Sequence, residues 1–199
     1  MLPTNLYGPN DNFDLERSHV LPAPIRKIHL GKCLEENDWP AIKTDLNNRP
    51  IDGFAPEEVI LDILQRYGIR VIRTNSSYSC SIENWGSGAP MREFLWSEEM
   101  ADACVFIMER VNFSDVAHGP EVRNTHINIG TGKEISIKEL AELIVKTTGF
   151  KGALVFNTSK PDGTMRKLTD VTKLNTLRWH HNIEIEEGVE RMYKWYTRK

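Results

Sequence analysis

The stretch that decides how this chain folds is its opening, in which residues 3–13 read PTNLYGPNDNF and residues 18–27 read SHVLPAPIRK. Two prolines and a glycine interrupt the first segment, which predicts a turn-rich loop rather than a long helix or strand. The second segment places Ser18 where a helix N-cap would stand. Polar loops held by a rigid frame are where proteins usually bind ligands. An ordinary loop whose asparagines cap turns would have the same composition.

A helix is predicted over residues 18–32, because apolar residues recur there at helical spacing, namely Leu21, Ile25 and Ile28. The two prolines of this segment fall in the first turns, where missing N–H groups matter least. His19 would then stand at the start of the helix, with Lys27 about two turns later. The positive end of the helix dipole and the lysine charge together suit an anion such as a pyrophosphate.

Further along, strand patterns at 79–84, 127–129 and 153–156 alternate with helical patterns, which predicts an α/β layer structure. Ser97 is expected to cap a helix with one apolar face, formed by Met100, Cys104, Ile107, Met108 and Val111. A capping box at the start of 137–148 marks another helix. Two helices complete the chain; Asp170 is expected to cap the first, and Val189, Met192, Tyr193 and Tyr196 give the second its apolar face.

Residues 33–78 fit this alternation least well. They contain two loop signals and a short helix that is expected to begin at Pro56 and end at Gly68. We interpret 33–78 as an insertion, which is either a lid over a ligand or a decorative excursion.

The composition excludes several classes of protein. The chain has 199 residues, 40% of them hydrophobic, which is enough for the core of one domain. A net charge of -3 without a basic stripe argues against nucleic-acid binding, and no apolar run approaches a membrane span or a signal-peptide core. Three cysteines without CxxC spacing indicate neither a disulfide framework nor a zinc site, so a reducing, cytoplasmic setting fits best. The adjacent His180 and His181 are interpreted as a solvated connection rather than metal ligands.

Four blocks in a fixed order carry a resemblance to a known family: the opening, WGSGAPMREFLW at 85–96, HINIGTG at 126–132 and SKPDGTMRKLTD at 159–170. Together they resemble the GDP-L-fucose synthases, extended short-chain dehydrogenase/reductases that epimerise and then reduce GDP-4-keto-6-deoxymannose with NADPH. The resemblance covers nearly the whole chain apart from 33–78, and only the C-terminal part of that enzyme. It implies that residues 1–199 form the α/β substrate-binding portion, with a few elements that would complete a Rossmann sheet.

Two features that such an enzyme needs are not found in this sequence. Residues 130–132 read GTG between a strand and a helix but lack the third glycine of a dinucleotide fingerprint, so we interpret them as a strand–helix turn. None of the five tyrosines has a lysine four residues later, whereas the family uses a Tyr-x-x-x-Lys pair for proton exchange with the C4 oxygen. The resemblance therefore implies that the N-terminal NADP-binding Rossmann half is missing, that NADP(H) would be bound incompletely, and that the chain alone is inactive.

The resemblance also assigns roles to individual residues. It places residues 3–6 and His19 against the nicotinamide end of NADP, the first four being Pro3, Thr4, Asn5 and Leu6. His19 matches the family's active-site histidine, which donates or relays a proton during epimerisation, a task that suits a group titrating near neutral pH. The positions that bind the GDP-sugar are matched by Lys27, Trp85, Arg92 and Asp162. Without the resemblance these would be surface charges, a core tryptophan and a turn aspartate.

Two alternatives remain open. The chain could be a nucleotide-sugar binding module that has lost catalysis, or a fragment of a related nucleotide-sugar epimerase or dehydratase. The expected partners are a GDP-sugar and either the missing N-terminal half or a second copy, because strands inside a parallel sheet are apolar on both faces and half a sheet leaves that surface uncovered. No metal, nucleic acid or membrane partner is expected.

Overall fold

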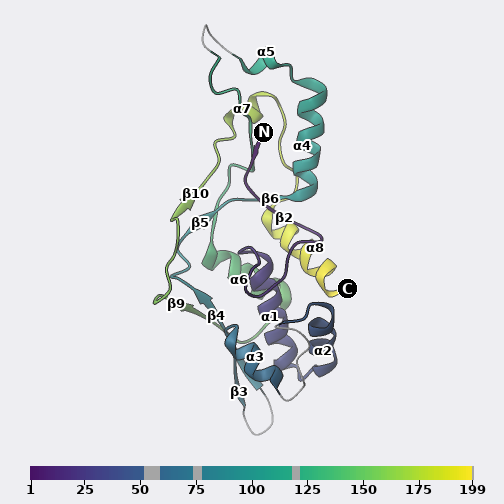
Figure 1. The fold of residues 1–199 in the computed structure, drawn as a ribbon, viewed down its shortest axis with the longest axis vertical. Coiled ribbons are helices and arrows are strands. Elements are labelled where there is room, and N and C mark those ends of the chain that lie inside the picture. The colour runs from purple at the N-terminus through teal and green to yellow at the C-terminus, as the bar shows by residue number, and fades with distance from the viewer. Residues whose placement is uncertain (52–58, 74–77, 118–121, 199) are drawn as a thin grey trace.

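Helices and short strands alternate along the chain in the computed structural model, which describes residues 1–51, 59–73, 78–117 and 122–198 (Figure 1). The helices are α1 Pro22–Glu35, α2 Trp39–Asn48, α3 Ile60–Arg66, α4 Ser97–Arg110, α5 Phe113–Val116, α6 Ile137–Thr148, α7 Thr172–Thr176 and α8 Ile185–Thr197. The strands are β1 Leu2–Pro3, β2 Asn5–Tyr7, β3 Ile69–Arg73, β4 Tyr78–Trp85, β5 Met91–Arg92, β6 Phe94–Trp96, β7 Asn128–Ile129, β8 Ile135–Ser136, β9 Ala153–Asn157 and β10 Arg166–Lys167. The α/β class is confirmed.

The strands form small sheets rather than one large one. In the first, β4 lies between antiparallel β3 and parallel β9, and α1 packs against β4. In the second, β5 lies between β10 and β8. The remaining two are parallel pairs, β1 with β7 and β2 with β6.

Strand β1 makes its backbone hydrogen bonds with β7 along one edge. The backbone N–H of Leu2 donates to the Ile127 carbonyl at 2.9 Å, and that of Thr4 donates to the Ile129 carbonyl at 3.0 Å. Pro3, between them, has its backbone on the other edge, where no strand in the described ranges pairs with it. Leu2 and Pro3 are both exposed.

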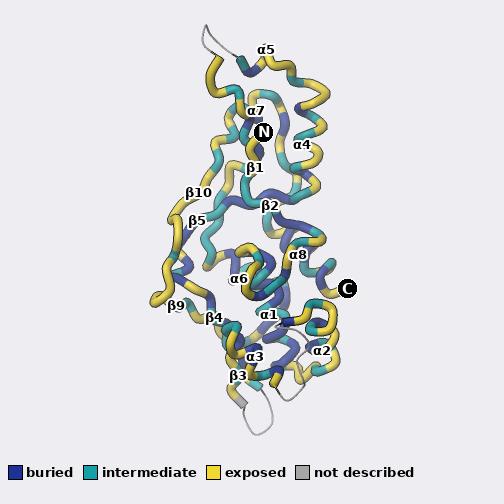
Figure 2. Tube along the Cα trace, viewed as in Figure 1, coloured by how far each residue is buried: buried dark blue, intermediate teal, exposed yellow. Residues whose placement is uncertain are grey.

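Two hydrophobic clusters fill the interior (Figure 2). The larger lies among α1, α2, α3, α6, α8 and β4, and the smaller lies at the other end of the elongated molecule, around α4 and α7. Among the described helices none combines the length and the apolar character that a membrane crossing requires.

The described residues of 33–78 contribute to the larger cluster. Ile42, Leu64 and Ile69 are completely buried in it, and β3 pairs with β4 over five residues. The described parts of this segment are therefore built into the core, which corrects the expectation of a decorative excursion. The helix start expected at Pro56 lies outside the described residues, and α3 ends before Gly68, whose φ of 83° suits a helix stop. That 33–78 is an insertion stays a prediction.

The start of the first long helix was wrongly predicted. α1 begins at Pro22, with Leu21 as an N-cap that makes no side-chain hydrogen bond, so Ser18 and His19 lie in the turn before it. The reason is a competing turn at Asp14, whose carboxylate accepts the backbone N–H groups of Glu16 and Arg17 at 2.9 and 2.8 Å. The prolines in the first turn and the position of Lys27 on the helix are confirmed.

Smaller corrections concern helix ends and faces. Ser97 is the first residue of α4 rather than its cap, because Trp96 is still extended and pairs with Tyr7. Met108 is 79% exposed, whereas Ala103 and Ile107 are the buried apolar residues of α4. The N-cap of α7 is Val171, although Asp170 accepts the Thr172 N–H at 2.9 Å. The capping box of α6 and the apolar face of α8 are confirmed.

Candidate functional site

A cavity of about 440 Å³ opens where three parts of the chain meet: the turn leading into α1, the end of α3 and the end of β4. It brings together His19, Lys27 and Trp85, three of the residues expected to act on a ligand. The described residues that line it are Leu15, Glu16, Ser18, His19, Val20, Ala23, Pro24, Lys27, Arg66, Tyr67, Asn84, Trp85 and Ile137.

Lys27 supplies a positive charge to this cavity. It lies on α1 and is half-buried, and burial lowers its pKa although the negative charge of Glu83 opposes the effect. The Glu83 carboxylate is held elsewhere, since it accepts from Asn157 Nδ2 at 2.8 Å and forms an ion pair with Arg70. Within the described part of the chain Lys27 makes no hydrogen bond or ion pair. An anionic ligand would satisfy this ammonium group.

His19 and Trp85 are the accessible groups at this site. His19 is exposed in the turn before α1, and Trp85 is the last residue of β4 with 69% of its surface exposed. Lys160 Nζ lies 5.2 Å from the centre of the Trp85 ring, in a cation–π contact. An exposed indole beside a lysine provides a flat apolar face that can cover a sugar or a base.

Asp162 lies next to Trp85 but is already bonded to the protein. Its Oδ1 accepts the Ser87 N–H at 2.6 Å and its Oδ2 accepts the Ser87 hydroxyl at 2.8 Å. Gly86 has a φ of 83°, and a Cβ there would lie 2.3 Å from Asp162 Oδ1, so the turn requires glycine. Asp162 therefore holds the turn that follows Trp85, and its binding of a nucleotide stays a prediction.

The remaining expected residues do not line this cavity. Arg92 lies in β5 and donates through Nη1 to the Met91 carbonyl at 2.7 Å. Residues 3–6 lie in and between β1 and β2, where Thr4 Oγ1 and Asn5 Nδ2 donate to the Glu93 carbonyl at 3.4 and 2.7 Å. Their contacts with NADP or substrate stay predictions.

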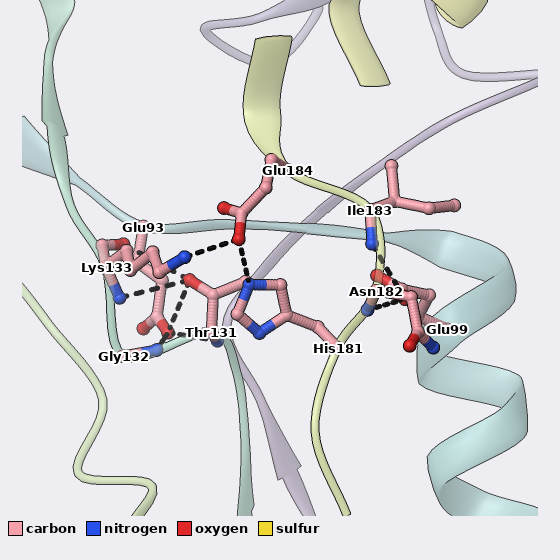
Figure 3. A network of polar contacts seen from close by, with 9 residues as sticks. All are labelled: Glu93, Glu99, Thr131, Gly132, Lys133, His181, Asn182, Ile183 and Glu184. Carbon is pink, nitrogen blue, oxygen red and sulfur yellow. Dashed lines mark hydrogen bonds and ion pairs between the residues drawn. The ribbon is translucent and has the colours of Figure 1, made fainter. Parts of the chain in front are cut away.

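Glu93 is a buried carboxylate that the sequence reasoning missed (Figure 3). Oε1 accepts the backbone N–H groups of Thr131 and Gly132 at 2.6 and 2.7 Å, and Oε2 accepts that of Thr169 at 2.9 Å. A Cβ at Gly130 would lie 2.3 Å from Oε1, which explains the first glycine of the GTG turn. Glu93 thus ties together three segments: the turn at 130–132, Thr169 and, through its carbonyl, the opening of the chain.

The histidine pair differs partly from the expectation. His180 is exposed, but the His181 side chain is only 11% exposed, and its Nε2 lies 3.4 Å from Glu184 Oε1 (Figure 3). Glu184 also forms an ion pair with Lys133. The description of His181 as solvated is therefore corrected. Over the ranges that the structure describes, no three potential ligands are grouped so as to hold a metal ion.

Two of three comparisons with known proteins find relatives of this chain. No family model matches it. Over 201 residues it is 39% identical to the GDP-L-fucose synthase of Escherichia coli (strain K12), across 98% of this chain and 47% of that protein. Over 197 residues it is 38% identical to GDP-L-fucose synthase 1 of Arabidopsis thaliana, across 99% and 45%. The chain is similar to one part of the GDP-L-fucose synthases. It spans about half the length of these curated relatives.

Solved structures agree with this resemblance. A GDP-6-OMe-4-keto-L-xylo-heptose reductase from Campylobacter jejuni matches with a TM-score of 0.86 and 41% identity, across 98% of this chain and 52% of that one. MlghC, a GDP-mannoheptose C4 reductase from the same organism with NADP bound, matches with a TM-score of 0.79 and 40% identity, across 98% and 51%. The resemblance carried by the four sequence blocks is confirmed, as is the α/β fold shared with GDP-sugar reductases.

Proposed function

We propose that residues 1–199 are the substrate-binding portion of a GDP-L-fucose synthase, and that this portion works together with an N-terminal NADP-binding Rossmann half. The complete enzyme would convert GDP-4-dehydro-6-deoxy-D-mannose to GDP-L-fucose by 3,5-epimerisation and NADPH-dependent 4-reduction. The observation that carries the proposal is the single cavity shared by His19, Lys27 and Trp85. Its setting would be the reducing cytoplasm, for which three free cysteines argue.

The lining residues suit distinct tasks in this reaction. The Lys27 ammonium group would bind the pyrophosphate, and the Trp85 ring would cover a flat face of the ligand. Inversion beside a ketone removes a carbon-bound proton and returns one to the opposite face, and His19 would donate or relay that proton. Arg92 and Asp162 are proposed to contact the GDP-sugar from neighbouring segments.

NADPH, when bound, would supply the hydride that reduces C4. Residues 3–6 are suited to forming a rim for it rather than to holding it alone, because the Thr4 and Asn5 side chains are engaged by the Glu93 carbonyl. Incomplete binding of the cofactor by this chain is therefore part of the proposal.

GDP binding tests the role of Lys27. Replacing Lys27 with alanine should weaken GDP binding roughly tenfold to a hundredfold in calorimetry, the value of one hydrogen bond to a charged group. Burial lowers the pKa of Lys27, so its ammonium group should lose its proton at a pH below the ordinary lysine pKa of 10.5. As the pH rises, the GDP affinity of the wild type should therefore begin to fall before pH 10.5 is reached. The Lys27→Ala variant should not show this fall.

A matched control is Lys32→Ala on the same helix, since Lys32 pairs only loosely with Glu36, at 3.9 Å. This control should bind GDP as the wild type does. Equal GDP affinity in the wild type and Lys27→Ala, or no binding by the wild type, would contradict the proposal.

Supplying an N-terminal NADP-binding half separates the enzyme from a non-catalytic nucleotide-sugar binding module. The chain alone should form no GDP-fucose from the keto sugar and NADPH, because residues 1–199 contain no Tyr-x-x-x-Lys pair. Co-expression with the N-terminal half of a GDP-L-fucose synthase should produce activity that a His19→Ala chain does not support. GDP binding without any gain of activity would favour the module, and product from the chain alone would refute the proposed inactivity.

A third possibility keeps the enzyme class and changes the sugar, as in a related epimerase or dehydratase. Relatives at 40–41% identity are named as reductases of GDP-linked heptoses, which favours guanine as the base whichever sugar is bound. Competition between GDP and UDP at the Lys27 cavity decides the base, and GDP should compete better.

A further inference from the structure

The inward face of β4 ends on a polar residue. Side chains alternate along this strand, and Cys80, Ile82 and Asn84 occupy the buried positions, with 2%, 0% and 8% of their surface exposed. This strand packs against α1, so an apolar residue would be expected at the third position as at the first two. The amide of Asn84 stands instead where the strand reaches the cavity that holds Lys27.

The Asn84 amide nitrogen has no partner among the residues that the structure describes. Its Nδ2 is shielded from water and makes no hydrogen bond to any described residue, and the same holds for Oγ of Ser18, which also lines the cavity. A buried donor without an acceptor destabilises a folded protein. Polar groups that break the local apolar pattern at such a cost are typical of functional sites. Two such groups in one cavity indicate that a ligand completes their hydrogen bonds.

The chemistry of the lining indicates which ligand. The Lys27 ammonium, the Asn84 amide nitrogen and the Ser18 hydroxyl can all donate hydrogen bonds. Among the described lining residues the cations Lys27 and Arg66 outnumber the one carboxylate, Glu16. A group rich in acceptor oxygens and negatively charged, such as a diphosphate, matches this set.

We propose that Asn84 is a ligand-binding residue of this cavity, where its amide donates a hydrogen bond to a diphosphate oxygen held by Lys27. The inference rests on the proposed function, because it takes the diphosphate of a GDP-sugar as the ligand. Ser18, in the turn before α1, would add a second neutral donor. The cavity would then recognise the diphosphate by shape as well as by charge.

The test is the variant Asn84→Leu, which keeps the side-chain volume and removes the amide. A purely structural asparagine would lose stability on this change. A ligand-binding asparagine should instead give an unchanged or higher urea midpoint, because the unpaired donor is gone, while GDP affinity measured by calorimetry falls roughly tenfold to a hundredfold. The Ile82→Val variant, two residues earlier on the same face, should lower the midpoint and leave GDP affinity unchanged.

GDP and GDP-mannose serve as the two probes. An equal loss of affinity for both supports a bond to the diphosphate, whereas a loss confined to GDP-mannose would overturn that assignment. If the wild-type chain binds GDP and Asn84→Leu binds it equally well, the inference fails while the proposed function stands. If the wild-type chain binds no GDP, the proposed function fails and this inference fails with it.

Discussion

Replacing Asp45 with alanine is expected to destabilise the chain by about 3–5 kcal/mol, the cost of removing one partner from a buried ion pair. Asp45 is 5% exposed and Arg26 is 1% exposed. Arg26 Nε donates to Asp45 Oδ2 at 2.9 Å, and Tyr196 donates its hydroxyl proton to Asp45 Oδ1. The alanine variant would leave the Arg26 guanidinium buried without its counter-ion, at a point where α1, α2 and α8 meet.

Urea unfolding of three variants measures this effect. Tyr196→Phe removes one hydrogen bond and should cost less, about 1–3 kcal/mol. The double variant Arg26→Met with Asp45→Leu removes the two most buried charges and leaves the more exposed Arg49, which lies 3.5 Å from Asp45 Oδ1. It should recover much of the loss, because the unpaired buried ion rather than the missing attraction dominates the cost. A loss below about 1 kcal/mol in Asp45→Ala, or no recovery in the double variant, would show that water reaches this ion pair.

The second large effect is expected at Glu93. Glu93→Gln should lower the free energy of unfolding by about 2–4 kcal/mol, since hydrogen bonds to a charged acceptor are weakened and an NH2 group now faces backbone donors. The turn at 130–132 and Thr169 would lose their common anchor. Faster amide hydrogen exchange at Thr131 and Gly132 should accompany the loss of stability.

Glu109→Gln is the matched control, because Glu109 is exposed on α4 and should change stability by less than about 0.5 kcal/mol. If Glu93→Gln unfolds at the same urea concentration as Glu109→Gln, the network around Glu93 contributes no stability and the role assigned to it is wrong.

Features whose determinants lie close together in the sequence could be predicted. The start of α6 is set by Ser136 and Glu139, which exchange hydrogen bonds over three residues, and its end by Gly149, whose φ of 75° few other residues adopt. The prediction of where α1 starts failed because the Asp14 side chain stabilises a different local turn. Propensity patterns do not decide between two such turns.

Features that depend on distant partners could not be predicted. The Glu93 carboxylate bonds to groups 38 to 76 residues away in the sequence, and no spacing rule connects them. The core role of Ile42 and Leu64 likewise follows from packing in three dimensions. The candidate site was partly predictable. His19, Lys27 and Trp85 were identified through the family resemblance. Asn84 could have been identified from the sequence, because it lies on the same face of the strand as Cys80 and Ile82.

The proline in β1 determines which hydrogen bonds the edge of that strand away from β7 can make. Because Pro3 has no N–H, its backbone can only accept a hydrogen bond on the side away from β7. Two identical chains that paired symmetrically about Pro3 would set one proline carbonyl against another, and neither residue could supply an N–H donor. A strand of different sequence, with an amide hydrogen at the matching position, would pair without that conflict. This edge of β1 therefore disfavours pairing with a second copy of itself.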